Sequence, residues 1–595
     1  MQSHGSRDGS RAMPSLADVR AEAGLDGGRF GGPLLLVATG IAMLWWTWGA
    51  WPDPLVDFGR ELYVPWRLAE GDALFTDIAW FNGPLSQYLN ALLFQVLGPG
   101  LSVLVWSNAL VLTASVAMLY SLIARLSDRL TATVAGVLFL LVFAFGQYVG
   151  IANYNWIAPY SHEATHGVAL ALATLAALER WHRTRSLTSL ALGGLALGLC
   201  FLTKVETFLA GSLASSVLLA GAVRGRDVRA ASAFVVAAVV PVLVSVSLVG
   251  VTGTLGAWPS VLNTEVARLP FYSATMGLDR PAARAVDLLI WAGSWLLILL
   301  PLLAAARLAR GTRGPKVPLL TAAALLLALA PLTERISWPD ALRPLPLFVI
   351  AIAGWLVVGA WRGEGTRHRA AGIAFAALGL GLLAKVLLHV RVGHYGFVLA
   401  MPACMLVVTA LVGWLPAWLD ERGLRGDVLR AGGVALVAIF ALEHLSITGD
   451  WLDSKTQVVG EGRDRFRTDV RGAFVHGAVA QVAGSGVSSL AVLPEGVMLN
   501  YLARTPNPTP YINFMPPEEI LFGDDAWTDA FRRSPPDMIL IVPKDTSEYG
   551  RGAFGVGYGR SLAAWVASEY VPSGAIRIDG IPFEIVMLVR SSPTG

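Results

Sequence analysis

Long apolar runs, separated by short polar connections, make up most of the chain as far as about residue 450. Most of these runs contain about 18 or more residues, the length of a helix that crosses a membrane. We therefore predict a mainly α-helical, polytopic membrane bundle of about thirteen spans. The predicted spans cover residues 33–51, 101–124, 131–149, 163–181, 187–203, 205–223, 231–252, 286–306, 317–333, 342–361, 371–388, 396–414 and 428–448.

Clusters of basic residues indicate which ends of the spans face the cytoplasm. They fall in every second connection, and the positive-inside rule places such connections on the cytoplasmic side together with the N-terminus. An odd number of spans then leaves the C-terminus outside, in a protein of the cytoplasmic (inner) membrane. The clusters are Arg125 and Arg129; Arg180, Arg183 and Arg185; Arg224, Arg226 and Arg229; Arg307, Arg310, Arg313 and Lys316; Arg362, Arg367 and Arg369; and Arg422, Arg425 and Arg430.

The stretch 187–223 tests this topology, because it lies between two basic clusters and must cross the membrane twice if both are cytoplasmic. As a helix its 37 residues would extend roughly 55 Å at about 1.5 Å per residue, close to two crossings of a core about 27–30 Å thick. The double crossing places Lys204 and Glu206 at an outer turn.

Three regions follow from the change in pattern along the chain. A polar tail at 1–32 is predicted to be disordered and cytoplasmic, and residues 33–449 form the membrane domain, with a first outer loop at 52–100. From residue 450 to 595, turn-rich polar sequence replaces the apolar runs. There SSLAVLP, PDMILIVP and FEIVMLVR predict strands and GRSLAAWVASEY predicts a helix, which together indicate a small extracytoplasmic α/β domain.

Composition excludes several classes of protein. The net charge is only +3 and the basic residues stand between apolar runs, so we expect no nucleic-acid partner. Cys200 and Cys404 both lie inside apolar runs and are expected to pack as small apolar residues. We find no GxGxxG sequence, no phosphate-binding loop of the GxxxxGK[ST] type and no internal repeat, which argues against a protein driven by nucleotide hydrolysis.

Asp57 is the first candidate for chemistry, because it follows the first span directly. A carboxylate held at the membrane surface can act as a general base that takes the proton of an attacking hydroxyl. The alternative is an aspartate that only caps a helix or shapes the loop. Arg60, three residues further on, would pair with Asp57 or contact a phosphate.

The second candidate is the HExxH sequence at His162, Glu163 and His166. If a helix begins near Ser161, both histidines lie on one face, one turn apart, as zinc ligands would. Three interpretations stay open: a metalloprotease with Glu163 as general base, a metal or substrate site within a transferase, and buried polar residues with a structural role. No third-ligand motif follows in a later apolar segment.

Further polar residues reach the predicted outer surface from other connections. Lys204, Arg335, Arg391, His394 and Tyr395 could together surround the developing charge of a lipid-linked phosphate leaving group. Each one taken alone could equally be the snorkelling end of a helix.

The first outer loop carries a resemblance to a known family. D-x-x-R at Asp57 and Arg60, followed by WRLAEGDALFTDIAWFNGPLSQYLNALLFQVLG, resembles the acidic first loop of the GT-C superfamily of polytopic glycosyltransferases. The similar branch contains the dolichyl-phosphate-mannose protein mannosyltransferases and the bacterial aminoarabinose transferases. The resemblance implies inverting transfer of a sugar from a polyprenyl-phosphate donor to a lipid, glycan or protein acceptor at the outer membrane face.

This resemblance also implies roles for particular residues. Asp57 would match the catalytic carboxylate, and Glu163 would lie where the family often has a second acidic site. There are departures, since Asn82 and Gly83 replace a lysine and the first proline of the aminoarabinose branch. The complete set of expected substrate-binding residues is Arg60, Glu61, Asn82, Lys204, Glu206, Arg335, Arg391, His394 and Tyr395; a divalent metal (Mg²⁺, Mn²⁺ or Zn²⁺) would be held by His162, Glu163 and His166.

Two rival functions belong to other classes. An intramembrane zinc protease would use the HExxH sequence and would not need Asp57. A transporter or lipid flippase would carry charges near the bilayer midplane and show repeated halves, whereas here the charges are predicted at the outer rim.

Overall fold

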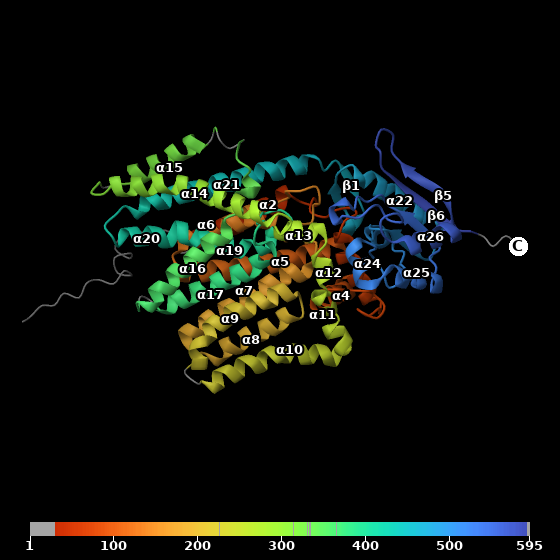
Figure 1. Ribbon diagram of the computed structural model, residues 1–595, viewed down its shortest axis with the longest axis horizontal. Coiled ribbons are helices and arrows are strands. Elements are labelled where there is room, and N and C mark those ends of the chain that lie inside the picture. The colour runs from red at the N-terminus through yellow and green to blue at the C-terminus, as the bar shows by residue number, and fades with distance from the viewer. Residues whose placement is uncertain are drawn as a thin grey trace, which may run out of the picture.

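The computed structural model describes residues 30–224, 227–312, 314–329, 331, 335–363 and 366–591. It is an elongated molecule in which a bundle of helices runs along the long axis and an α/β unit occupies one end (Figure 1). We call residues 457–590 the C-terminal unit. The predicted disordered tail at 1–32 lies almost entirely outside the described residues.

A helix stands at every predicted span, so the predicted mainly α-helical bundle is confirmed. In the described part of the chain, seven helical segments are long and apolar enough to cross a membrane, and five more apolar helices are shorter. The chain is therefore a multi-pass membrane protein. The bundle helices are α2 (Gly31–Trp46), α5 (Leu101–Leu126), α6 (Arg129–Leu138) with η1 (Phe139–Ala144), α7 (His162–Thr184), α8 (Leu187–Phe201), α9 (Val205–Arg224), α10 (Val228–Leu255), α14 (Pro281–Leu308), α15 (Lys316–Leu329), α16 (Leu345–Trp361), α17 (Thr366–Leu383), α18 (Gly396–Leu399), α19 (Met401–Thr409) with η5 (Ala410–Trp414), α20 (Leu415–Asp420) and α21 (Gly426–Asp453).

The predicted double crossing at 187–223 consists of two helices, α8 and α9, which pack on each other and on α7. The chain turns between them at 202–204, so Lys204 and Glu206 lie at that turn as predicted. At the opposite end of the bundle, predicted cytoplasmic connections contact one another. Arg425 donates to the carbonyl oxygen of Thr312 at 2.8 Å, and Arg430 lies 3.0 Å from Asp128. These connections lie far from the C-terminal unit (Figure 1).

The C-terminal unit is built on a four-stranded sheet of order β3-β4-β6-β5. β3 (Leu490–Leu493) and β4 (Met538–Ile541) are parallel, with Leu493 aligned to Ile541, and β6 (Glu584–Arg590) is antiparallel to both β4 and β5 (Tyr570–Arg577). The three predicted strands correspond to β3, β4 and β6, and the predicted helix corresponds to α26 (Arg560–Glu569). β5 was not predicted, because its sequence contains proline, serine and glycine and does not alternate between buried and exposed positions.

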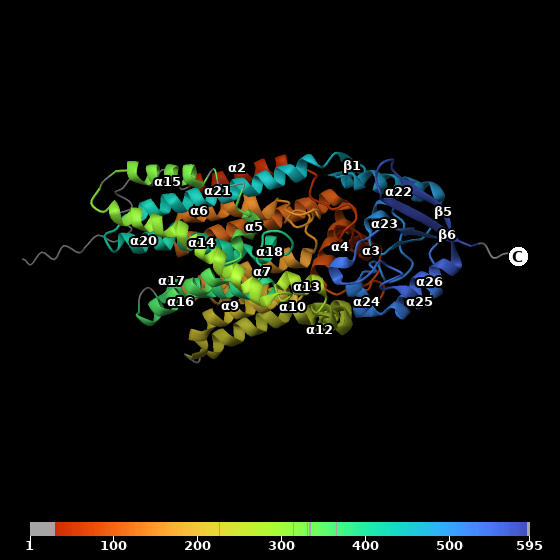
Figure 2. The same cartoon turned by 45° about the horizontal axis from the view of Figure 1, so that its top comes forward.

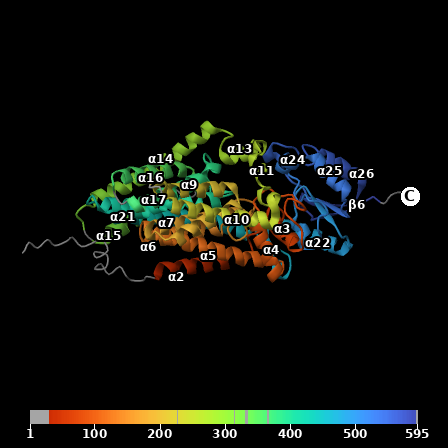
Figure 3. The same cartoon turned by 90° about the horizontal axis from the view of Figure 1, so that it is seen from below.

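Other elements complete this unit and its junction with the bundle. They are the hairpin β1 (Gln457–Val459) and β2 (Phe466–Thr468), α22 (Arg471–Ser485), α23 (Met498–Ala503), α24 (Pro516–Phe522), α25 (Asp524–Arg533) and η7 (Ser547–Tyr549); on the bundle side, α3 (Phe58–Ala69), α4 (Leu85–Leu97), α11 (Trp258–Leu262), α12 (Thr264–Ala267), α13 (Pro270–Met276), η3 (Trp338–Leu342) and η4 (Ala384–Val386). Figure 2 shows α3 and α4 beside the C-terminal unit, and Figure 3 shows α11 and α13 between the bundle and α24.

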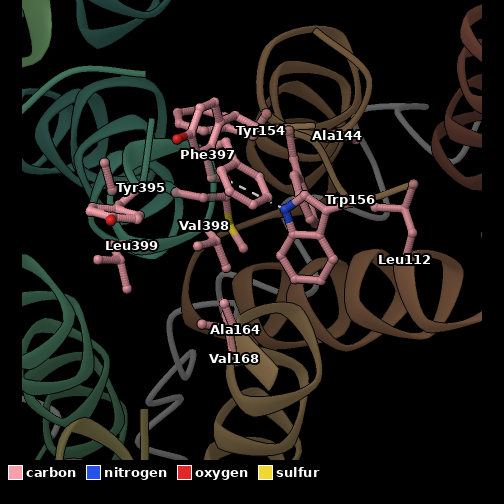
Figure 4. Close-up of a cluster of buried hydrophobic side chains, with 14 of the residues drawn as sticks. Leu112, Ala144, Tyr154, Trp156, Ala164, Val168, Tyr395, Phe397, Val398 and Leu399 are labelled. Atoms are coloured by element: carbon pink, nitrogen blue, oxygen red, sulfur yellow. Dashed lines mark hydrogen bonds between the residues drawn. The ribbon is translucent and has the colours of Figure 1, made fainter. Parts of the chain in front are cut away.

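Close packing joins the first outer loop to the C-terminal unit. α3 packs on α23 and on α4. At Gly59 an added Cβ would come within 2.4 Å of the backbone nitrogen of Met498, so only glycine allows the two helices to approach so closely. Within the bundle, the segment before α7 packs in a cluster of buried hydrophobic side chains, in which the indole nitrogen of Trp156 donates to the carbonyl oxygen of Phe397 at 3.4 Å (Figure 4).

Candidate active site

A cavity of about 430 Å³ lies where the helical bundle meets the C-terminal unit. Its walls come from the first outer loop, the segment before α7, the start of α9, the short helices α11–α13, the segment around η4, and the C-terminal unit. We call it the Asp57 cavity. Its polar and aromatic lining residues are Asp57, Arg60, Phe81, Asn82, Tyr154, Tyr160, Lys204, Glu206, Ser260, Asn263, Phe271, Tyr272, Lys385, Tyr395, Glu495, Asn513, Glu518, Lys544, Glu548 and Tyr549.

Asp57 stands in a strained backbone conformation at the start of α3. Its φ of 58° and ψ of −60° are those of the central residue of a γ-turn, and the N–H of Phe58 accordingly donates to the carbonyl oxygen of Val56 at 2.6 Å. A non-glycine residue rarely adopts this conformation, and such strain is concentrated at functional sites. The strained turn is therefore evidence for a functional role of Asp57 that is separate from the sequence motif.

The charge of Asp57 depends on its surroundings. The surroundings of its carboxyl raise the pKa to about 6; burial is the main cause, Arg60 and Lys544 oppose the rise, and the carboxylate of Glu495 adds to it. Arg60 donates a short hydrogen bond from Nη2 to Oδ1 of Asp57, and its Nη1 atom lies 3.7 Å from Oε1 of Glu518. A carboxyl with this pKa is mostly ionised at neutral pH and can accept a proton.

Two lysines share one carboxylate on the bundle side of the cavity. The Nζ atom of Lys385 lies 2.9 Å from Oε1 of Glu206, and the Nζ atom of Lys204 lies 4.0 Å from the same oxygen. Lys204 also donates to the hydroxyl of Tyr160 at 3.2 Å. With one negative and two positive charges, this group has an excess of positive charge that suits an anionic ligand.

The C-terminal unit supplies cavity residues that the sequence did not reveal. Lys544 and Glu495 form an ion pair, with Nζ 2.6 Å from Oε2. Burial raises the pKa of Glu518, which is also in the cavity, to about 7, against the opposing effect of Arg60. A signal was present, because Glu495 and Lys544 closely follow the predicted strands SSLAVLP and PDMILIVP, and the carboxyl ends of parallel strands commonly form ligand sites.

The HExxH residues are arranged differently from a metal site. His162 donates from Nδ1 to Oε2 of Glu61, and its Nε2 accepts from the amide nitrogen of Asn108 at 3.0 Å. The same amide nitrogen donates to the carbonyl oxygen of Ile157 at 2.9 Å, which fixes the orientation of the Asn108 amide. Both ring nitrogens of His162 are therefore occupied and cannot bind a metal ion.

Glu163 and His166 belong to a buried hydrogen-bond network that also contains Glu61 and Gln87. Glu163 accepts from the hydroxyl of Ser161 at 2.7 Å and from the amide nitrogen of Gln87 at 3.0 Å, and Gln87 donates to Glu61 as well. His166 has Nδ1 3.0 Å from the hydroxyl of Ser86. Within the described ranges, no group of three or more His, Cys, Asp or Glu side chains could hold a metal ion. The contacts of these residues form a hydrogen-bond network, the structural interpretation of the three, and do not fit the expected metal site.

The structure brings together only some of the expected substrate-binding residues. Five of them line the Asp57 cavity together with Asp57, the expected base: Arg60, Asn82, Lys204, Glu206 and Tyr395. Arg391 and His394 instead line a neighbouring pocket of about 220 Å³, which shares Tyr395 and Glu548 with the cavity.

Two expected residues lie elsewhere. Glu61 is 1% exposed and belongs to the network with His162 and Gln87; it does not line the cavity. Arg335 is exposed and lines neither the cavity nor the neighbouring pocket. Sequence position could not separate these cases, because side chains from one connection can point either into a cavity or away from it.

Comparisons with known proteins give structural similarity only. No protein family and no curated protein sequence matches the chain. Among solved structures, the chain is similar to ArnT from Cupriavidus metallidurans bound to undecaprenyl phosphate, with 14% identity, a TM-score of 0.44, and coverage of 95% of this chain and 99% of ArnT. It is also similar to the Archaeoglobus fulgidus oligosaccharyltransferase in complex with zinc and sulfate, with 12% identity, a TM-score of 0.48, and coverage of 85% of this chain and 68% of that chain. The apo form of the same oligosaccharyltransferase gives 12% identity and a TM-score of 0.48, with coverage of 90% and 71%. We therefore base the function on the residues of this chain.

Proposed function

We propose that the protein is a membrane glycosyltransferase of the GT-C type that moves a sugar from a polyprenyl-phosphate donor to an acceptor hydroxyl, with inversion. The observation that carries this proposal is the composition of one cavity. A partly buried carboxylate in a strained turn, Asp57, shares it with two lysines, Lys204 and Lys385, which both lie within 4.0 Å of the Glu206 carboxylate.

The lysine pair suits the phosphate of the donor. When the bond between the sugar and the phosphate breaks, the leaving oxygen takes the electron pair, and cationic donors already in place stabilise the new charge. Apolar side chains of the same cavity, among them Val205, Leu209 and Val261, suit the first carbons of an isoprenoid chain.

Asp57 suits the acceptor side of the same reaction. As the acceptor oxygen attacks the anomeric carbon, its proton passes to the Asp57 carboxylate, and the lipid phosphate leaves from the opposite face. A single displacement of this kind inverts the anomeric configuration. Arg60, which is bound to Asp57, orients the carboxylate and is close enough to contact the donor.

We further propose that this cavity opens outside the cytoplasm. The C-terminal unit and α11–α13, which contribute to the lining of the cavity, lie at one end of the bundle, and the arginine-rich connections lie at the other (Figure 1). The positive-inside rule assigns those connections to the cytoplasm. Two observations favour the transferase over the rival functions: both ring nitrogens of His162 have hydrogen-bond partners, and the charged residues of the cavity lie where the bundle meets the C-terminal unit.

Transfer in vesicles tests the proposal. The full chain is reconstituted and supplied with either polyprenyl-phosphate sugars or sugar nucleotides, and sugar transfer to acceptors extracted from membranes is measured. We expect transfer from the lipid-linked donors only. Replacement of Lys385 by Met should reduce transfer about 10- to 100-fold, the value of one charged hydrogen bond, while Lys316→Met, which changes an exposed lysine at the start of α15, should not. Transfer from sugar nucleotides, or equal activity of the two variants, would contradict the proposal.

A further inference from the structure

An ion pair between Glu495 and Lys544 lies beside Asp57, at the ends of the two parallel strands of the C-terminal unit. β3 ends at Leu493 and β4 ends at Ile541, and these two residues are aligned in register. Glu495 follows the end of the first strand and Lys544 the end of the second, so both side chains emerge from the same edge of the sheet. Their ion pair is 2.6 Å long and largely buried, with side-chain exposures of 9% and 18%.

Glu495 also contacts the backbone of Asp57. Its Oε1 atom accepts a hydrogen bond from the Asp57 N–H at 3.2 Å, while its Oε2 atom holds Lys544. The N–H that Glu495 binds belongs to the central residue of the γ-turn. A turn with positive φ is costly for an aspartate and persists only where its surroundings hold it.

The same unit holds the beginning of this turn as well. Arg471, at the start of α22, lies 2.8 Å from the carboxylate of Asp53. The other oxygen of Asp53 accepts from the N–H groups of Leu55 and Val56, at 3.0 and 2.9 Å. The segment from Asp53 to Asp57 is therefore fixed at both ends by side chains that lie more than 400 positions later in the sequence.

We propose that Glu495 and Lys544 are positioning residues that hold Asp57 in its reactive conformation, so that the C-terminal unit forms part of the active site. This inference rests on the proposed function, because it takes Asp57 to be the base. The pair lies beside the carboxylate, and Glu495 contacts the backbone of Asp57, not its carboxylate oxygens.

The charged groups around Asp57 predict the direction in which each substitution should change its pKa. Arg60 from α3 faces the carboxyl, as do Glu495 and Lys544 from the C-terminal unit and Asp53 from the same loop. Burial is the largest influence on the pKa of Asp57; Glu495 and Asp53 raise it, and Arg60 and Lys544 lower it. Removing either member of the ion pair should therefore move this pKa, in opposite directions.

The first experiment measures transfer against pH in the full-length protein. In Lys544→Met the rise of activity with pH should move to higher pH, and in Glu495→Gln it should move to lower pH with a smaller maximal rate. The matched control is Arg504→Met, which breaks another ion pair of the same unit, 2.6 Å from Asp464, and should leave the profile unchanged. Shifts in the same direction in both variants, or none, would overturn the proposal.

A second experiment does not need activity. Hydrogen–deuterium exchange of peptides covering residues 53–58 should be faster in Glu495→Ala than in wild type, and unchanged in Arg504→Met. Equal exchange in all three proteins would overturn the positioning role. If instead Asp57→Asn keeps its transfer activity, the proposed base fails, whatever the exchange shows, so the two failures are distinguishable.

Discussion

The imidazole of His162 donates a hydrogen bond to Glu61 from one nitrogen and accepts one from the Asn108 amide, 3.0 Å away, at the other. The HExxH sequence is typical of zinc proteases, but here its first histidine is part of a buried hydrogen-bond network. It links α7 to α3 and α5, and so supports the helix that begins directly after Asp57.

The first prediction concerns metal content. The purified protein should contain no zinc bound by His162, because both nitrogens of its ring already have partners. His162→Ala should leave the metal content unchanged but lower thermal stability, by about 1–3 kcal/mol for the unsatisfied buried groups. Elemental analysis and thermal unfolding measure the two effects. Loss of one equivalent of zinc in the variant would show that the metal interpretation was right.

The second prediction concerns Gln87, whose amide nitrogen bridges two buried carboxylates, Glu61 and Glu163, at 3.0 Å each. Gln87→Leu would leave both carboxylates without this donor, and we expect a loss of about 1–3 kcal/mol or more in stability. The control is Gln481→Leu, at an exposed position of α22, where the melting temperature should hardly change. Equal melting temperatures for the two variants would speak against the bridge.

The third prediction concerns the pH dependence of the wild-type enzyme. Asp57 must be ionised to accept a proton, and burial raises the pKa of its carboxyl to about 6. Activity should therefore be low at pH 5, rise through about pH 6 and level off above it. The measurement is kcat/KM for transfer at saturating acceptor across this range. Activity that is undiminished at pH 4.5 would exclude a base with this pKa.

The fourth prediction concerns Lys204, the second lysine of the cavity. Its replacement by Met should weaken binding of polyprenyl phosphate about tenfold or more, since a charged contact to phosphate is lost. The binding can be followed by tryptophan fluorescence or by competition with a labelled lipid phosphate. Arg335→Met, at an exposed position outside the cavity, is the control. If both variants bind the lipid phosphate as the wild type does, the lysine pair does not form the phosphate site.

Much of the fold could be predicted because its physical signal is local. Apolar runs of membrane-spanning length and alternating basic clusters located most of the bundle helices, and they placed Lys204 and Glu206 at a turn on the same side as Asp57. In the C-terminal unit, runs of apolar residues between turns located β3, β4 and β6. β5 was missed because its partner strand, rather than its own sequence, stabilises it.

The site was harder to predict, because it depends on contacts between distant parts of the chain. Asp57 and Arg60 were found from one short motif. Glu495, Glu518 and Lys544 were not. Glu495 and Lys544 do follow predicted strands, but only the parallel pairing of those strands shows that both residues face one cavity. His162 shows the reverse case: its spacing to His166 fits zinc, but its partners from α3 and α5 decide its chemistry.

The most direct test of the central claim compares two aspartates of the same outer loop. Asp57→Asn removes the proposed base, whereas Asp77→Asn changes an exposed carboxylate whose partner is a loop N–H. With a polyprenyl-phosphate sugar in vesicles, we predict that the first variant loses about 10²- to 10⁴-fold in transfer rate while the second stays near wild type. Transfer by Asp57→Asn at the rate of Asp77→Asn would contradict the account.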